Sequence, residues 1–287
     1  MTKNLIITKA QRFGNFVIQI RNALHIALFY NYNLILPKHR FFNSTYIVIN
    51  DTVTLDNEKI YDKNWPDFFY AHKIKNIDSS LFKINSIRVL SILKSIFNIK
   101  NVSPLGINDL VIHIRSGDLF CEGWVHPNYV TPPLSYYKNI INGNKYDNIY
   151  LIAEDRLNPC INKLLEIYPK INFKIQSLKE DITLILRSTN IVTSYGTFIQ
   201  EILRFSDNIK NIYSPNYRAI NMPGCITHII QLSEYRKLMG PWKNTPEQIK
   251  TMMTYGIVPE PNPIPRKHLP IFKKPPLNLH LLPQKRI

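Results

Sequence analysis

Short aliphatic runs alternate with amphipathic segments of about ten residues through the second half of this chain. The aliphatic runs predict five strands, over residues 110–114, 148–153, 173–175, 191–193 and 209–213. The segments between them carry apolar residues at the helical period and predict helices over 134–141, 158–168, 181–188 and 197–205. Strands that alternate with helices pair in parallel, so the pattern predicts a doubly wound sheet.

The first half of the chain opens on the same alternation. It predicts a strand over residues 4–8, a helix over 15–30 and a second strand over 33–37. Residues 46–50 resemble a further strand and 81–99 a further helix, whereas 51–80 show no clear pattern. The segment 101–107 (NVSPLGI) marks a domain boundary. The expected fold class is α/β and GT-B-like, with two Rossmann-like lobes, 1–105 and 106–240, whose parallel sheets face a cleft.

Residues 241–287 differ from the rest in composition. They hold ten of the 20 prolines, and the segment 259–265 (PEPNPIP) excludes regular structure. A helix is expected over 245–255, with Thr245 as its N-cap and Pro246 at its first position. The remainder predicts a basic, proline-rich C-terminal arm.

The formal net charge of +16 first suggests a nucleic-acid partner. The charge is spread unevenly, however, with +8 over 1–105, +2 over 106–240 and +6 over 241–287, and no run of five basic residues occurs. Lys outnumbers Arg 24 to 12 and Ile and Asn abound, as an AT-rich coding sequence produces regardless of function. We therefore expect no nucleic-acid partner, and interpret the excess as coding bias plus a surface for an anionic membrane or an acidic acceptor.

Composition also limits the cellular setting. No apolar stretch approaches the roughly 18–20 residues that span a bilayer. The three cysteines, Cys121, Cys160 and Cys225, form no CxxC, which argues against a disulfide framework or a zinc site. We expect a cytoplasmic protein that contacts a membrane peripherally.

Glycine is scarce, and three of the nine glycines lie beyond the carboxyl ends of predicted strands: Gly14, Gly117 and Gly196. The carboxyl ends of parallel strands form the ligand site of a doubly wound sheet, although three ordinary tight turns are the alternative. At one of these ends, His113 and Arg115 point to the same face of a strand. The planar fork of Arg115 suits a diphosphate. A structural ion pair between Arg115 and Asp118, beside a core histidine, remains the other interpretation.

The segment 113–118 (HIRSGD) resembles the HxRRGD motif of the α-1,2-fucosyltransferase family and of the related α-1,6- and protein O-fucosyltransferases. Further segments follow in that family's order: 14–19 (GNFVIQ), 133–137 (PLSYY), 153–155 (AED), Asp181, 194–198 (SYGTF) and 213–215 (YSP). The resemblance covers residues 4–216, although 38–105 contribute almost nothing to it.

The resemblance implies an inverting, metal-independent glycosyltransferase that moves fucose from GDP-fucose, a co-substrate rather than a cofactor, to a glycan hydroxyl. It implies a donor-nucleotide lobe over 106–240 and an acceptor-side lobe over 1–105. Arg115 is then expected to bind the β-phosphate, and His113 to support the nucleotide. The implied donor-binding residues are Gly14, Asn15, His113, Arg115, Glu154, Asp155, Ser194, Gly196 and Thr197.

Individual roles follow from the same resemblance. Ser194 and Thr197 are expected to bind diphosphate oxygens at a helix N-terminus. Glu154 and Asp155 contact the guanosine or its ribose, or else act only as charges before a helix. The chain contains no DxD to hold a metal-diphosphate.

The chain also departs from the family pattern. The second Arg of the motif is Ser116, and SNSTF has become SYGTF, and both changes touch donor contacts. Two alternatives therefore stay open: the same fold with another GDP- or UDP-sugar, and a non-catalytic GT-B-like protein that binds glycan or polyanion.

The loop after the Arg motif supplies the candidate catalytic bases. These are Glu122, Asp118 and His126, with Glu122 favoured, Asp118 suited to a structural pairing, and no side-chain base as a further alternative. Aromatic residues near this loop suit sugar rings or ordinary packing: Trp124, Tyr129, Tyr136 and Tyr137.

Overall fold

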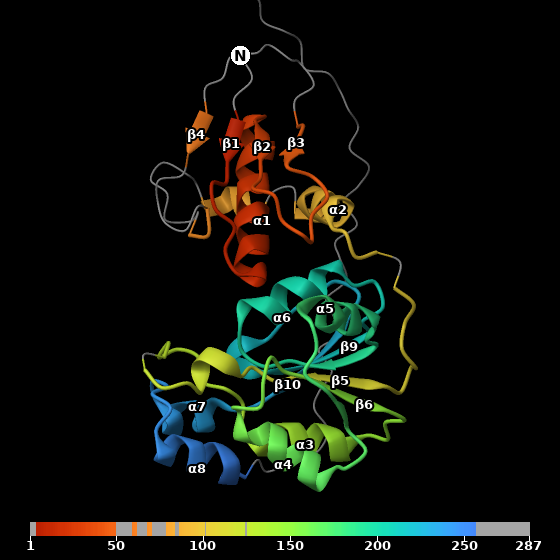
Figure 1. Cartoon of the computed structure of the whole chain (residues 1–287), viewed down its shortest axis with the longest axis vertical. Helices are drawn as coiled ribbons and strands as arrows, with labels where there is room; N and C mark the ends of the chain where they lie inside the picture. Colours follow the sequence, from red (N-terminus) through yellow and green to blue (C-terminus); the bar gives the residue numbers. More distant parts are fainter. Residues whose placement is uncertain are drawn as a thin grey trace, which may run out of the picture.

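The computed structural model describes residues 4–49, 59–61, 68–70, 79–83, 86–100, 102–123 and 125–256. These residues form two α/β lobes, stacked one above the other in Figure 1. Each lobe is built on its own sheet, of four strands in the amino-terminal lobe and six in the carboxyl-terminal lobe. The predicted fold class is thereby confirmed, while the segment 259–265 of the expected C-terminal arm lies outside the described residues.

The amino-terminal sheet has the order β3-β2-β1-β4, in which β1 pairs in parallel with β2 and β4, and β3 runs antiparallel. Its elements are β1 (Asn4–Ile6), α1 (Phe13–Tyr30), β2 (Asn33–Ile35), β3 (Tyr46–Ile47), β4 (Lys59–Tyr61), η2 (Ser79–Lys83) and α2 (Ser86–Ile96). Helix α1 buries the predicted stripe that includes Phe16, Ile20 and Leu24. It ends at Asn31, whose left-handed conformation (φ 58°) lets its N–H bond to the carbonyl of Ala27.

The carboxyl-terminal sheet is entirely parallel, in the order β10-β9-β8-β5-β6-β7. Its strands are β5 (Leu110–His113), β6 (Ile149–Ile152), β7 (Asn172–Phe173), β8 (Asn190–Val192), β9 (Asn211–Pro215) and β10 (Ile226–Ile230). The chain winds outward from β5 in one direction and from β8 in the other. The neighbours β5 and β8 therefore flank the topological switch point, where open α/β sheets bind ligands.

Helices cover both faces of this sheet (Figure 1). Helix α5 (Leu178–Arg187) and helix α6 (Thr197–Ile202), continued by η4 (Leu203–Phe205), lie on the face toward the amino-terminal lobe. The opposite face carries α3 (Leu134–Gly143), α4 (Pro159–Ile167), α7 (Ser233–Met239) and α8 (Pro246–Thr254). Short turns η3 (Gly117–Leu119) and η5 (Asn216–Arg218) follow β5 and β9. The sequence pattern predicts neither β10 nor α7, which extend the lobe by one more strand and helix.

Helix α8 begins as expected, with the Thr245 hydroxyl accepting from the N–H of Gln248 and Pro246 in the first turn. It packs against α3 and α4, and Trp242 and Met252 are buried in the same cluster. The described part of 241–287 is thus joined to the carboxyl-terminal lobe. The division of the chain at residues 105 and 240 stays a prediction.

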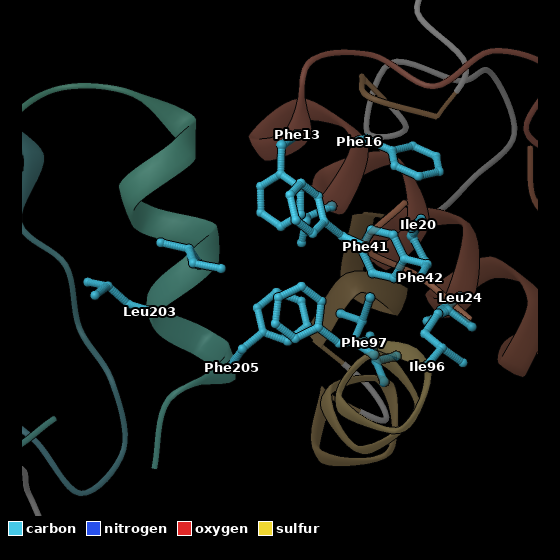
Figure 2. Close-up of a cluster of buried hydrophobic side chains, with 14 of the residues drawn as sticks. Phe13, Phe16, Ile20, Leu24, Phe41, Phe42, Ile96, Phe97, Leu203 and Phe205 are labelled. Carbon is cyan, nitrogen blue, oxygen red and sulfur yellow. The ribbon is translucent and has the colours of Figure 1, made fainter. Parts of the chain in front are cut away.

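The two lobes share one hydrophobic cluster (Figure 2). The rings of Phe97 in the amino-terminal lobe and Phe205 in η4 stack with centroids 4.2 Å apart, and the ring of Phe13 lies 6.2 Å from that of Phe97. The cluster continues to Val111 and Ile191 on the sheet of the other lobe. This shared packing holds the start of α1 against the carboxyl edge of the large sheet.

Candidate functional site

A cavity of about 690 Å³ lies between the lobes, at the carboxyl ends of β1, β5, β6 and β8. Four loops supply most of its wall, namely 12–15, 113–118, 153–155 and 196–198. Of the predicted donor-binding residues, the cavity brings together Gly14, Asn15, His113, Arg115, Glu154, Asp155, Gly196 and Thr197. A cavity therefore lies at the topological switch point of the sheet, and the segment 113–118 (HIRSGD) lines it.

His113 and Arg115 are positioned by Ser194, which is fully buried and does not line the cavity. The Ser194 hydroxyl accepts from the backbone N–H of Arg115 at 2.9 Å and lies 2.9 Å from Nδ1 of His113. Burial, with a smaller effect of Arg115, lowers the pKa of His113 to about 3. The imidazole is thus neutral near pH 7. If the Ser194 hydroxyl donates to Nδ1, Nε2 carries the remaining N–H.

The guanidinium of Arg115 forms part of the cavity wall. Its Nη2 pairs with Asp118, and its Nη1 lies 4.0 Å from a carboxylate oxygen of Glu154. Its Nε is buried and finds no hydrogen-bond partner within the described part of the chain. A buried donor without a partner is costly, and the accessible part of the guanidinium presents a positive charge to the cavity that suits an anionic ligand.

The turn after Arg115 depends on Gly117 and Ser116. Gly117 has φ +59°, and a Cβ there would lie 1.4 Å from a carboxylate oxygen of Glu154. The Ser116 hydroxyl donates to Asp155 and accepts from the backbone N–H of Asn158 at 2.9 Å. Ser116, which replaces an Arg of the family motif, therefore ties the β5 loop to the start of α4.

The two acidic residues after β6 differ in their surroundings. Asp155 accepts from Ser116 and from the backbone N–H of Leu157 at 2.9 Å, so its carboxylate organises the loop. Glu154 is exposed on the cavity wall. Glu154 is thus the freer of the two to meet a ligand.

The amino-terminal lobe reaches the site through the start of α1. Gly14 faces the backbone of α6 so closely that a Cβ would lie 2.6 Å from the nitrogen of Phe198. The Thr197 hydroxyl donates to the Asn15 side chain at 2.7 Å, and Arg12 pairs with Asp118 at 3.0 Å. These contacts join the two lobes at the cavity.

Gln19, the last residue of the segment 14–19, has a structural role in the loop before α1. Its buried side chain accepts from the N–H of Gln11 at 3.1 Å and donates to the carbonyl of Lys9 at 3.2 Å. The β1–α1 loop is held at the cavity by these two bonds.

Asp181 is a cavity residue that sequence reasoning did not place in the site. It lies in the first turn of α5 and is 7% exposed, and Gln176 donates to its Oδ1 at 2.8 Å. Burial raises its pKa to about 6. Its place in the family order was the signal that could have identified it.

Of the three candidate catalytic bases, one lines the cavity and two do not. Asp118 lines the cavity but is shared between two arginines. Glu122 is exposed and His126 stacks on Tyr129 with centroids 4.4 Å apart, and neither lines the cavity. Tyr129 does line the cavity.

The other predicted aromatic residues lie elsewhere. Tyr136 and Tyr137 are fully buried in the core of the carboxyl-terminal lobe. Trp124 falls outside the described residues.

The described residues show neither a metal cluster nor a membrane-spanning helix. They contain no group of three or more His, Cys, Asp or Glu side chains that could hold a metal ion. Among the same residues, no helix has the length and apolar character to cross a membrane.

Comparison with known proteins gives fold similarities only. Neither protein-family models nor curated protein sequences match this chain. Among solved structures, POFUT1 in complex with GDP-fucose aligns at a TM-score of 0.44 and 12% identity, over 74% of this chain and 98% of that one. The fucosyltransferase NodZ from Bradyrhizobium aligns at 0.37 and 9%, over 74% and 95%. The E. coli heptosyltransferase WaaC with ADP-2-deoxy-2-fluoro heptose aligns at 0.40 and 7%, over 80% and 93%. The chemistry of the cavity depends on the residues that line it.

Proposed function

We propose that the protein is an inverting glycosyltransferase that moves a sugar, fucose, from GDP-fucose to a glycan hydroxyl. The observation that carries the proposal is the guanidinium of Arg115, which lines a cavity at the switch point of the sheet with an unpartnered Nε among the described residues. Such a cation in a partly enclosed site stabilises the negative charge that develops on a leaving diphosphate.

The local charge argues against a polyanion as the ligand. Arg12 and Arg115 share the single carboxylate of Asp118, so these three side chains carry a net charge of +1. Glu154, Asp155 and Asp181 also line the cavity, so its charged side chains are two arginines and four carboxylates. This balance argues against the alternative of a polyanion-binding protein, and leaves Arg115 as a single placed cation for a diphosphate.

Asp181 supports guanine as the base of the donor. A carboxylate can accept from both N1–H and the N2 amino group of guanine, whereas uracil presents the single donor N3–H. Gln176 occupies only Oδ1 of Asp181, so Oδ2 stays available for such a contact. This favours a GDP-sugar over the alternative of a UDP-sugar.

The acceptor hydroxyl must lose its proton during transfer. Glu122 stays our prediction for the base although it does not line the cavity. Two exposed carboxylates do line it, Asp118, which is paired with two arginines, and Glu154. We expect Glu122→Gln to lower turnover by roughly 100-fold if Glu122 is the base. Near-normal turnover in Glu122→Gln, with a large loss in Glu154→Gln, would transfer the role to Glu154.

We also propose that transfer needs no divalent metal. Turnover in excess EDTA should equal turnover in untreated protein, since Arg115 supplies the charge that a metal provides elsewhere. A rate that collapses in EDTA and returns with Mg²⁺ or Mn²⁺ would contradict this.

The basic surface is a separate proposal. We propose cytoplasmic placement and peripheral contact with an anionic membrane or an acidic acceptor. Co-sedimentation with phosphatidylserine vesicles that exceeds co-sedimentation with phosphatidylcholine vesicles supports membrane contact, and equal sedimentation opposes it.

A panel of labelled donors tests the main proposal. Labelled GDP-fucose, GDP-mannose, UDP-glucose and UDP-galactose are each supplied with a mixture of oligosaccharides and with water as acceptors. Transfer of fucose, lost in Arg115→Ala and kept in the exposed α2 control Arg88→Ala, is the expected result. Transfer from another donor supports the same fold with a different sugar. Release of sugar from no donor supports the non-catalytic alternative.

A further inference from the structure

A row of three tyrosines extends from the cavity along the carboxyl edge of the large sheet. We call Tyr129, Tyr195 and Tyr217 the tyrosine row. The ring centroids of Tyr129 and Tyr195 lie 4.8 Å apart, and those of Tyr195 and Tyr217 lie 6.4 Å apart with an interplanar angle of 27°. Tyr129 lines the cavity, so the row begins inside the proposed donor site.

The row is assembled from three loops that follow β5, β8 and β9. Tyr195 directly precedes Gly196 of the cavity wall, and Tyr217 lies in η5. The Tyr217 hydroxyl donates to the carbonyl of Val130 at 3.3 Å, which ties η5 to the β5 loop. All three rings belong to half-buried residues, in contrast to the fully buried Tyr136 of the core. Tyr217 packs against the core cluster of the carboxyl-terminal lobe, whereas Tyr129 and Tyr195 belong to neither hydrophobic cluster, so core packing does not account for these two rings.

Arg218 supplies the polar component. Its guanidinium lies over the ring of Tyr195, 5.1 Å from the centroid, and its Nη2 donates to Gln200 at 2.8 Å. Its Nε is buried and has no hydrogen-bond partner in the described ranges. Arg218 thus offers a cation beside an aromatic face.

The row and the donor site are electrostatically connected at Tyr129. Burial raises the pKa of the Tyr129 hydroxyl, Tyr195 adds to the rise, and Arg115 and Arg218 both oppose it. The charges of two cations, Arg115 of the proposed donor site and Arg218 beside the row, thus both act on the Tyr129 hydroxyl.

These groups match the chemistry of a sugar ring. A pyranose presents a C–H face that packs on an aromatic ring, and hydroxyls at its edge that accept from a guanidinium. Tyr195 and Gly196 also stand where the resembling family has Asn and Ser, so the row belongs to this chain in particular.

We infer that the tyrosine row and Arg218 form the acceptor subsite, and that its occupant is an oligosaccharide whose reacting hydroxyl lies near Arg115. This inference rests on the proposed function. It places part of acceptor recognition in the carboxyl-terminal lobe, whereas the sequence prediction assigned it to residues 1–105.

The test compares Tyr195→Ala and Arg218→Ala with wild type and with the control Tyr30→Ala. Tyr30 is 40% exposed at the far end of α1 and also stacks on a neighbouring ring, that of Tyr32. Tyr195→Phe keeps the ring and serves as the conservative variant. Each protein, saturated with GDP, is applied to an array of neutral and acidic oligosaccharides, and its thermal shift with GDP is measured separately.

The wild type, Tyr30→Ala and Tyr195→Phe should be retained by the same oligosaccharides. Tyr195→Ala and Arg218→Ala should bind them at least about tenfold more weakly, which corresponds to about 1.4 kcal/mol. Their GDP shifts and unliganded melting temperatures should match those of wild type. If the best oligosaccharide is also fucosylated, its KM should rise in these two variants while kcat changes little.

Two results would overturn the inference. One is unchanged oligosaccharide affinity in both Tyr195→Ala and Arg218→Ala while the GDP shift persists. The other is a wild type that no oligosaccharide retains. A wrong proposed function would give a different result. The wild type would then show no thermal shift with GDP, even if oligosaccharide binding depended on Tyr195.

Discussion

At the scale of single residues, the site depends on buried polar groups that hold other groups in place. Ser194 was expected to bind diphosphate oxygens, but its hydroxyl is occupied by Arg115 and His113, and its role is to position them. Asp155 is likewise engaged with Ser116. The charged groups left to meet a ligand include the guanidinium of Arg115 and the carboxylates of Asp181 and Glu154.

Replacing Ser194 tests this positioning role. Ser194→Ala leaves the N–H of Arg115 without its partner and removes the bond that orients His113, which should cost about 1–3 kcal/mol of unfolding free energy. GDP affinity should fall as well, because Arg115 loses its anchor. Calorimetry and urea unfolding measure both effects. Ser206→Ala, which removes a buried hydroxyl remote from the cavity, should lower stability without changing GDP affinity.

The titration of Asp181 predicts a pH dependence. Burial raises its pKa to about 6, so the carboxylate is ionised above that pH and protonated below it. Only the ionised form accepts from both guanine donors. GDP affinity should therefore fall as the pH drops through about 6, and should do so much less in Asp181→Asn. A wild-type affinity that is flat between pH 5 and 8, with unchanged binding in Asp181→Asn, would remove Asp181 from the nucleotide site.

At the scale of elements, the decisive contact is between the first turn of α1 and α6. The sequence predicts both helices and places Gly14 at the end of β1, but it cannot show that Gly14 faces the backbone of Phe198. That approach depends on how two lobes dock, which no local pattern encodes. The same limit explains Asp181, since helix α5 brings it to the cavity only through the winding of the sheet.

The strands and helices around the site were the most predictable parts. The runs near β5, β6 and β8 are mostly aliphatic, and the structure confirms a strand in each. The segment of β10, ITHII, alternates less clearly after two prolines, and the sequence interpretation stopped before it. Pairing with β9, a non-local interaction, stabilises it as a strand.

Gly14→Ala tests the helix contact. The added methyl group meets backbone atoms rather than a flexible side chain, so the start of α1 must move away from α6. We expect a loss of about 1–3 kcal/mol in unfolding free energy, together with weaker GDP binding. The control Gly143→Ala adds a methyl group that meets nothing within 4 Å, and should leave GDP binding unchanged. Wild-type stability in Gly14→Ala would contradict the close contact.

At the scale of the whole molecule, the lobes are joined by a common core rather than by a linker alone. The stacked pair Phe97 and Phe205 brings together buried side chains from the two lobes. The chain should therefore unfold in one cooperative transition. This rigidity holds Arg12 and Asp118 on opposite sides of one cavity.

Phe97→Ala measures the coupling. Removing a fully buried ring should cost about 3–5 kcal/mol, and unfolding should remain a single transition with a lower midpoint. Phe29→Ala, at a residue that is 52% exposed, should change stability by only about 0.5 kcal/mol. Two separate transitions in the wild type, with only one of them shifted by Phe97→Ala, would show that the lobes fold independently.

The most direct test of the central claim is a calorimetric titration of GDP into wild type, Arg115→Ala and the control Arg88→Ala. We expect one GDP bound per chain in the wild type and in Arg88→Ala. Arg115→Ala should bind at least about 100-fold more weakly, because it loses charge-assisted hydrogen bonds to the diphosphate. A wild type that does not bind GDP, or an Arg115→Ala variant with wild-type affinity, would contradict a nucleotide-sugar site at the switch point.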